Sequence, residues 1–159
     1  MHTPLSAHHL AEVLPGSWVV KATNMKMWLD GRRRDPILRY SIAQTAPLVF
    51  NESVEFVQAD GKPSTVTGKS REIAGEFVWH GSGILRVVAG RWQATGSCHG
   101  GDAIVIRYRR TPLVPSGLSV LVREGAVVEE LRAEVAHHAH DLGLGLEDFA
   151  TLNWHLEQV

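Results

Sequence analysis

The stretch LPGSWVVK, residues Leu14–Lys21, places a tryptophan two residues after a glycine, at the start of an apolar run. Pro15-Gly16 is typical of a break between two elements, and the two valines after Trp18 favour a strand. Residues 4–15 are expected to form a short helical lead-in that ends at this break. The stretch therefore predicts a first strand that carries a large aromatic ring at its beginning.

The length and composition set the broad class. With 159 residues, of which 44% are hydrophobic, the chain is expected to form one domain, residues 1–159, with a substantial core. A net charge of −1 gives no overall attraction for nucleic acid or an anionic membrane, so neither partner is expected. No stretch approaches the roughly 20 apolar residues of a membrane span. Residues 1–16 show no signal-peptide pattern, and Cys98 is the one cysteine, so a cytoplasmic location is expected.

Residues 16–125 are predicted to form a series of strands. β-branched and aromatic residues alternate with polar ones between turn signals such as Asp60-Gly61. The first strand is expected to be long, over residues 17–29. The others are expected near residues 37–44, 47–58, 64–73, 75–81, 83–98, 103–111 and 118–124. Short connections favour an all-β, antiparallel up-and-down arrangement of eight or nine strands, stacked as a sandwich or closed as a barrel.

Residues 126–159 have a different pattern. Apolar residues recur every three or four positions, which predicts one helical stripe made of Val127, Val128, Leu131, Val135, Ala139 and Leu142. A short terminal element should follow and return further apolar side chains to the core, namely Leu146, Phe149, Leu152 and Trp154.

Three motifs together resemble the lipocalins, especially the bacterial members. Gly16-Ser17-Trp18 is similar to the family's G-x-W on the first strand. Arg123 ends the last strand, where the family places an arginine that stacks across that tryptophan. Residues 142–154, LGLGLEDFATLNW, are similar to the family's carboxy-terminal helix and short strand.

The resemblance implies one antiparallel up-and-down β-barrel of eight or nine strands, with a C-terminal helix packed outside. It also implies that Gly16, Trp18 and Arg123 form a plug at one end. An indole can cover up to ~250 Å², and a guanidinium stacked on it adds about 1 kcal/mol. The threonine-aspartate-tyrosine signature of classical members is missing, and GGDAIVIRY, residues 100–108, stands near its place. The chain is therefore expected to lie outside the classical subfamilies.

An eight-stranded barrel has room for one small ligand. Strand alternation predicts that Tyr40, Ile42, Phe50, Val54, Phe56, Ile104, Ile106 and Tyr108 point inward. Met25, Met27 and Trp28 lie at the far end of the first strand from Trp18, which should be the open end. The candidate ligand-binding residues are Asn24, Met27, Trp28, Tyr40, Phe56, Trp79, His80, Trp92 and Tyr108. Such a lining suits an apolar or aromatic molecule, although a solid core without a cavity is the competing interpretation for each residue.

Histidines and basic residues offer fewer specific signals. His137 and His140 could share a helix face and bind a metal, but a solvated face is favoured, so no metal site is expected. His80 could point inward as a haem ligand, as in the related nitrobindin-type barrels, or as a general base. Arg32–Arg34 at the open end could attract an anionic headgroup or form a solvated loop.

Three functions are compatible with the sequence. The preferred hypothesis is a monomeric or homodimeric protein that binds a small hydrophobic ligand without a cofactor. The alternative is a cofactor-free cyclase or isomerase of secondary metabolism, in which Tyr40, Tyr108, His80 or Asn24 supplies one donor and the cavity supplies proximity. Haem binding through an inward histidine is the third.

Overall fold

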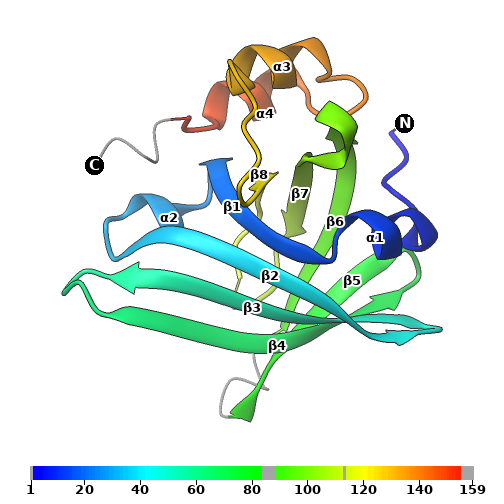
Figure 1. Ribbon diagram of the computed structural model, residues 1–159, viewed down its shortest axis with the longest axis vertical. Helices are drawn as coiled ribbons and strands as arrows, with labels where there is room; N and C mark the ends of the chain where they lie inside the picture. Colours follow the sequence, from blue (N-terminus) through cyan, green and yellow to red (C-terminus); the bar gives the residue numbers. More distant parts are fainter. Residues whose placement is uncertain (1, 84–88, 113, 155–159) are drawn as a thin grey trace.

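The computed structural model describes residues 2–83, 89–112 and 114–154. Eight antiparallel strands, each paired with the next along the chain, close into a barrel through the β1–β8 pairing (Figure 1). The predicted all-β, up-and-down barrel is therefore confirmed. The strands are β1 (Gly16–Thr23), β2 (Arg33–Thr45), β3 (Leu48–Gln58), β4 (Pro63–Ile73), β5 (Glu76–Gly81), β6 (Ala89–Cys98), β7 (Ala103–Arg109) and β8 (Gly117–Arg123).

Short helices flank the barrel. The helix α1 (Ala7–Val13) lies within the predicted lead-in and begins after Ser6, whose side chain accepts a hydrogen bond from the His9 amide. Its Leu10 is buried in the barrel core. The remaining helices are α2 (Lys26–Leu29), the 3₁₀ turn η2 (His99–Gly101), α3 (Leu131–His137) and α4 (Leu146–Thr151). No helix within the described ranges is long and apolar enough to span a membrane.

The first strand is shorter than predicted. β1 ends at Thr23, and Met27 and Trp28 lie on α2 rather than on the strand. The Thr23 hydroxyl accepts a hydrogen bond from the Met25 amide, which turns the chain out of the sheet. The Asn24 side chain then accepts a hydrogen bond from the Leu118 amide of β8. A side-chain oxygen thus takes the place of the backbone carbonyl that would continue the ladder between β1 and β8.

The barrel wall separates two apolar clusters. The inner cluster fills the end of the barrel near α1 and includes Trp18, Phe50 and Phe77. The outer cluster lies between the outside of β7 and β8 and the tail segment with α3 and α4, which covers these strands in Figure 1. This arrangement explains why residues 103–106 and 118–122 are buried at every position, whereas most other strands alternate.

The tail differs from the predicted continuous helix. α3 begins only at Leu131, so Val127 is 76% exposed. The expected short terminal element is the helix α4, followed by a single bridge between Thr23 and Asn153. The prediction that Leu146 returns to the core is wrong, because Leu146 lies in the first turn of α4 and is 92% exposed.

One inward prediction within the barrel is also wrong. Ile42 is 40% exposed, although Leu38 and Tyr40 on the same strand are buried. The register between β2 and β3 shifts between Ile42 and Gln44, and residues 41–45 of β2 are exposed throughout. Ile42 still pairs in register with Phe50, so its exposure follows from its position on the exposed end of β2 and not from a change of face.

Candidate ligand-binding site

One end of the barrel is closed by a stack of side chains. Trp18 is fully buried, and its indole Nε1 donates a hydrogen bond to the Leu14 carbonyl at 2.8 Å. The Arg123 guanidinium lies 4.3 Å from the Trp18 ring centre and donates to the carbonyls of Val13 and Pro15. A Cβ atom on Gly16, whose φ is +130°, would lie 2.8 Å from the Arg123 Nη1 atom. The structure thus brings Gly16, Trp18 and Arg123 together at one end.

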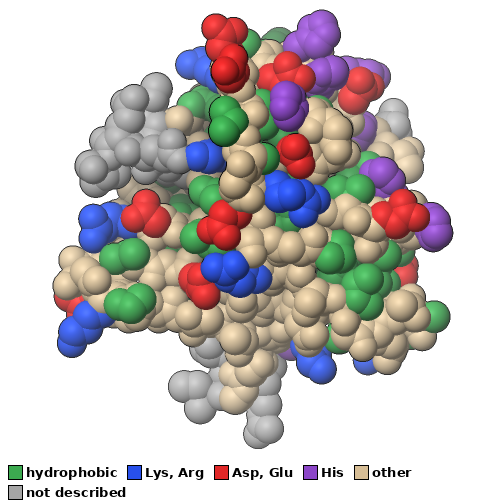
Figure 2. All heavy atoms as spheres, viewed as in Figure 1, with side chains coloured by type: hydrophobic (Ala, Val, Ile, Leu, Met, Phe, Trp, Pro, Cys, Tyr) green, Lys and Arg blue, Asp and Glu red, His purple; other side chains and the backbone are tan. Residues whose placement is uncertain are grey.

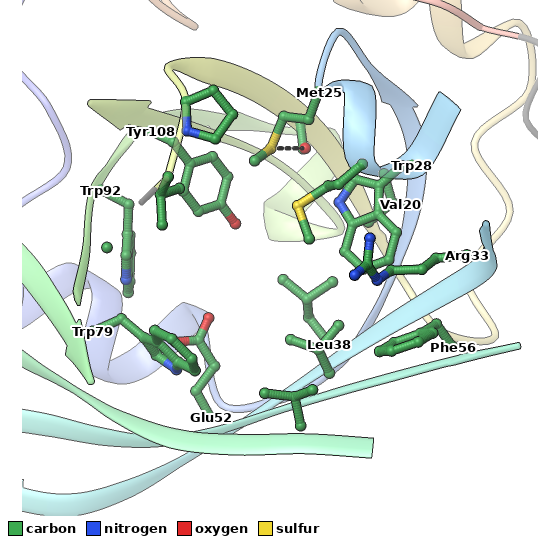
Figure 3. A pocket seen from close by; sticks show the side chains of 17 residues that line it. Val20, Met25, Trp28, Arg33, Leu38, Glu52, Phe56, Trp79, Trp92 and Tyr108 are labelled. Atoms are coloured by element: carbon green, nitrogen blue, oxygen red, sulfur yellow. Dashed lines mark hydrogen bonds between the residues drawn. The ribbon is translucent and has the colours of Figure 1, made fainter. Parts of the chain in front are cut away.

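A cavity of about 460 Å³ lies toward the opposite end, beneath α2 (Figure 3). Six of the nine predicted ligand-binding residues line it: Met27, Trp28, Phe56, Trp79, Trp92 and Tyr108. The other lining residues are Val20, Met25, Arg33, Leu38, Glu52, Val54, Val66, Gly90, Val114, Pro115 and Ser119. The barrel is therefore hollow at this end, and its wall is mainly aromatic and aliphatic.

Aromatic contacts fix the shape of the wall. Trp92 stacks on Phe77, with ring centres 4.5 Å apart and planes 13° from parallel. Trp28 meets Phe56 edge to face at 6.0 Å, and the Arg33 guanidinium lies 5.7 Å from the Phe56 ring centre. Arg33, from the predicted basic cluster, thus lines the cavity beside two aromatic rings. Such contacts hold flat hydrophobic surfaces open to a ligand.

Three predicted ligand-binding residues do not line the cavity. Asn24 is engaged by Leu118 and by the Thr151 hydroxyl, to which it donates at 3.0 Å. Tyr40 is buried behind the wall, 6.0 Å from Trp92 between ring centres. His80 is exposed, so the interpretation that it points inward is wrong. Trp79 takes the inward position on β5, and strand alternation sends the next side chain outward.

The histidines among the described residues do not line the cavity, and most of them are exposed. In Figure 2 the imidazoles visible on this face gather over the tail and the N-terminal segment. His137 and His140 are exposed, and His138 lies 3.3 Å from Glu134. The part of the chain that the structure describes has no histidine in the cavity wall and no cluster of three or more residues suited to hold a metal. The residues of the wall therefore do not fit the haem hypothesis.

The sequence analysis missed a buried carboxyl group in the cavity wall. Glu52 on β3 is only 6% exposed and lines the cavity beside Trp79 (Figure 3). The Ser70 hydroxyl donates to the Glu52 carboxyl at 2.7 Å, and the Trp92 indole donates to the Ser70 oxygen at 2.9 Å. The signal was present in the sequence, because Phe50, Glu52 and Val54 share one face of β3.

Burial controls the ionisation of this group. Removal of water raises the pKa of Glu52, and the hydrogen bond from Ser70 opposes that rise only in part. Burial also raises the pKa of Tyr108, with a smaller contribution from the nearby Glu52 charge. Burial also raises the pKa of Tyr40, and the Tyr40 hydroxyl lies close enough to Glu52 to lower the pKa of that carboxyl group as a hydrogen-bond donor. The cavity therefore has a buried polar group, Glu52, in a mainly apolar wall.

Comparison with known proteins places this geometry in a fold family. No family model and no curated protein matches the sequence. Lobster apocrustacyanin A1 superposes with a TM-score of 0.63 at 8% identity, over 96% of this chain and 86% of that one. The chain has a lipocalin-like fold. The predicted resemblance is thereby confirmed at the level of architecture.

Two further solved structures support the lipocalin-like fold. Apocrustacyanin C2 superposes with a TM-score of 0.62 at 8% identity, over 96% of this chain and 87% of that one. The siderocalin Ex-FABP superposes with a TM-score of 0.57 at 14% identity, over 92% and 95%. At these sequence identities the comparisons show a shared fold and give no information about a ligand of this protein.

Proposed function

We propose that this lipocalin-like protein binds a small hydrophobic or aromatic molecule in its barrel. The observation that carries the proposal is the cavity of about 460 Å³, walled by Trp28, Trp79, Trp92 and Tyr108 and closed below by the Trp18 plug. A concave, largely apolar site with a few polar groups is the usual form of a small-molecule site. Ex-FABP, described as a siderocalin with dual ligand specificities, gives a precedent for ligand binding on this fold.

A neutral fluorescent probe tests the proposal without knowledge of the natural ligand. N-phenyl-1-naphthylamine has a weakly basic, uncharged nitrogen at neutral pH and becomes bright in an apolar site. We expect a saturable rise in its fluorescence at one probe per protein molecule. Val54→Trp should abolish this rise, because Val54 lines the cavity and the larger side chain fills it.

Ser53→Trp is the matched control. Ser53 is the neighbour of Val54 on β3, and alternation along the strand directs its side chain to the outside. This variant should bind the probe as the wild type does. Equal binding by the wild type and both variants would place the probe on the surface and overturn the proposal, as would the absence of any saturable signal.

A second candidate function rests on Glu52. Burial in the cavity raises the pKa of this carboxyl group, and such a group can act as a general acid or base toward a bound substrate. A cyclase or isomerase that uses it would conserve the mass of its substrate. We would incubate a bacterial metabolite extract with wild-type protein and with Glu52→Gln and search for compounds that change retention time at constant mass. A conversion specific to the wild type supports the enzyme, and its absence favours binding alone.

A further inference from the structure

The hydrogen-bond chain behind Glu52 leaves one side of its carboxyl group available. The Trp92 indole can only donate, so the Ser70 oxygen accepts that bond and Ser70 must give its own proton to Glu52 Oε2. The Tyr40 hydroxyl also lies close enough to this carboxyl group to lower its pKa as a second hydrogen-bond donor. In Figure 3 the carboxyl group points into the cavity. Ser70 therefore holds the Glu52 carboxyl group in place on the wall side, and the group remains accessible as an acceptor from the cavity side.

Among the residues that the structure describes, no cation pairs with this carboxyl group. Among the described residues, the titratable groups that face it are Tyr40 from β2 and Tyr108 from β7, and both are neutral near pH 7. The groups from β4 and β6 are Ser70 and Trp92. A buried carboxylate without a positive partner is costly, so burial in this cavity disfavours the charged form of Glu52 and raises its pKa. A cation that entered the cavity would reverse this preference.

The surrounding rings suit a cation as well. Trp79, Trp92 and Tyr108 line the same part of the cavity as Glu52 in Figure 3. The face of an indole or phenol ring attracts an ammonium group, most strongly where water is excluded. Arg33 lies on the opposite side of the cavity from Glu52, so its charge favours a ligand whose cationic end is directed away from it.

We propose that the ligand is an amphiphilic amine, with an aromatic or aliphatic body and a protonated amino group that pairs with Glu52 among Trp79, Trp92 and Tyr108. The inference rests on the proposed binding function and specifies its ligand class. The body of the ligand would occupy the apolar space toward Trp28 and Phe56. Neutral and anionic molecules of the same shape would leave the carboxyl group without its partner.

Three probes of nearly equal size test this specificity by isothermal titration calorimetry. They are 4-phenylbutylamine, 4-phenylbutan-1-ol and 4-phenylbutyrate, which differ in the charge of one terminal group. At pH 7.5 we expect the amine to bind the wild type at least tenfold more tightly than the alcohol, and the butyrate to bind most weakly. Glu52→Gln should reduce the amine to the affinity of the alcohol. Glu55→Gln, on the outer face of the same strand beside Arg39, should retain the preference.

Proton linkage supplies a second readout. Because the ammonium group lowers the pKa of Glu52, amine binding should release protons at pH values just above the ordinary glutamate range, and Glu52→Gln should not. Titrations in two buffers of different ionisation enthalpy measure this release. Equal affinity for amine and alcohol, or the tightest binding by 4-phenylbutyrate, would overturn the inference. If N-phenyl-1-naphthylamine still binds in that case, the proposed binding function stands and only the ligand class is wrong.

Discussion

The Arg123 guanidinium stacks on the Trp18 indole at 4.3 Å while donating two hydrogen bonds to the chain that enters the barrel. One side chain therefore covers the ring and ties residues Val13 and Pro15 to the end of β8. Gly16 makes this close approach possible, since any Cβ there would meet the guanidinium. The closed end is thus a joint between the two termini of the barrel sheet as well as a plug.

Substitutions at this joint should lower stability by different amounts. Trp18→Ala removes a fully buried ring and should reduce the free energy of unfolding by about 3–5 kcal/mol. Arg123→Lys keeps the charge but cannot span both carbonyls in a planar fork, and should cost about 1–2 kcal/mol. Urea unfolding measures both. Arg110→Lys at an exposed position is the control and should change little; a loss equal to that of Arg123→Lys would contradict this account.

The wall of the cavity depends on a glycine. A Cβ atom on Gly68 would lie 2.4 Å from the His80 carbonyl oxygen and 2.6 Å from the Trp79 Nε1 atom. Gly68→Ala should therefore displace the Trp79 indole, lower stability by about 1–3 kcal/mol, and weaken the binding of N-phenyl-1-naphthylamine. Thr67→Ala, one residue earlier on β4, is the matched variant and should leave probe affinity unchanged. If Gly68→Ala bound the probe with unaltered affinity, the position of the Trp79 indole would not matter for binding.

Glu52 should make stability depend on pH in a definite direction. Burial raises the pKa of Glu52 in the folded protein, so the native state holds this proton more tightly than the unfolded chain. The contribution of protonated Glu52 to the free energy of unfolding is fully present below the pKa of the unfolded chain, near 4.5. It is lost as the pH rises through the pKa of the folded protein. Glu52→Gln should therefore gain stability relative to the wild type as the pH rises. Urea titrations from pH 4 to 8 measure the difference, and a flat difference would refute the assignment.

Asp148 should show the opposite dependence. Arg107 donates two hydrogen bonds to its carboxylate and thereby lowers the pKa of Asp148, which ties α4 to β7. The stabilisation is present above the unfolded pKa, near 3.8, and is lost as the pH falls through the folded pKa. Because the pair is partly exposed, Asp148→Asn should cost about 1 kcal/mol or less at pH 7 and nothing near pH 2. An equal loss at both values would mean that the charge is not responsible.

Sequence periodicity was sufficient for the barrel because strand alternation and short turns are local signals. The same rule placed Phe50, Phe56 and Tyr108 toward the interior. It failed at Ile42, which lies on the exposed end of β2. The separate suggestion that His80 could point inward is wrong because Trp79 takes the inward position on β5. Which part of a strand is covered depends on pairing between distant segments, which a single segment does not reveal.

The end of the first strand shows the same limit. Residues 17–29 have strand-like composition throughout. The strand nevertheless ends at Thr23, because the side chains of Thr23 and Asn24 form hydrogen bonds to β8 and to the turn.

Glu52 was overlooked for a different reason. A single acidic residue in an apolar alternation is usually assigned to a solvated face, and its partners Ser70 and Trp92 lie on strands remote in sequence.

The five tryptophan side chains test the central claim most directly, because their indole N–H groups give separate signals in a ¹H–¹⁵N correlation spectrum. Trp28, Trp79 and Trp92 line the cavity, whereas Trp18 forms the plug and Trp154 packs in the outer cluster. After assignment by single Trp→Phe variants, we would titrate the protein with N-phenyl-1-naphthylamine. The account predicts that the three cavity signals shift and the other two remain in place. Shifts confined to Trp18 or Trp154, or no shift at Trp28, Trp79 and Trp92, would contradict ligand binding in this cavity.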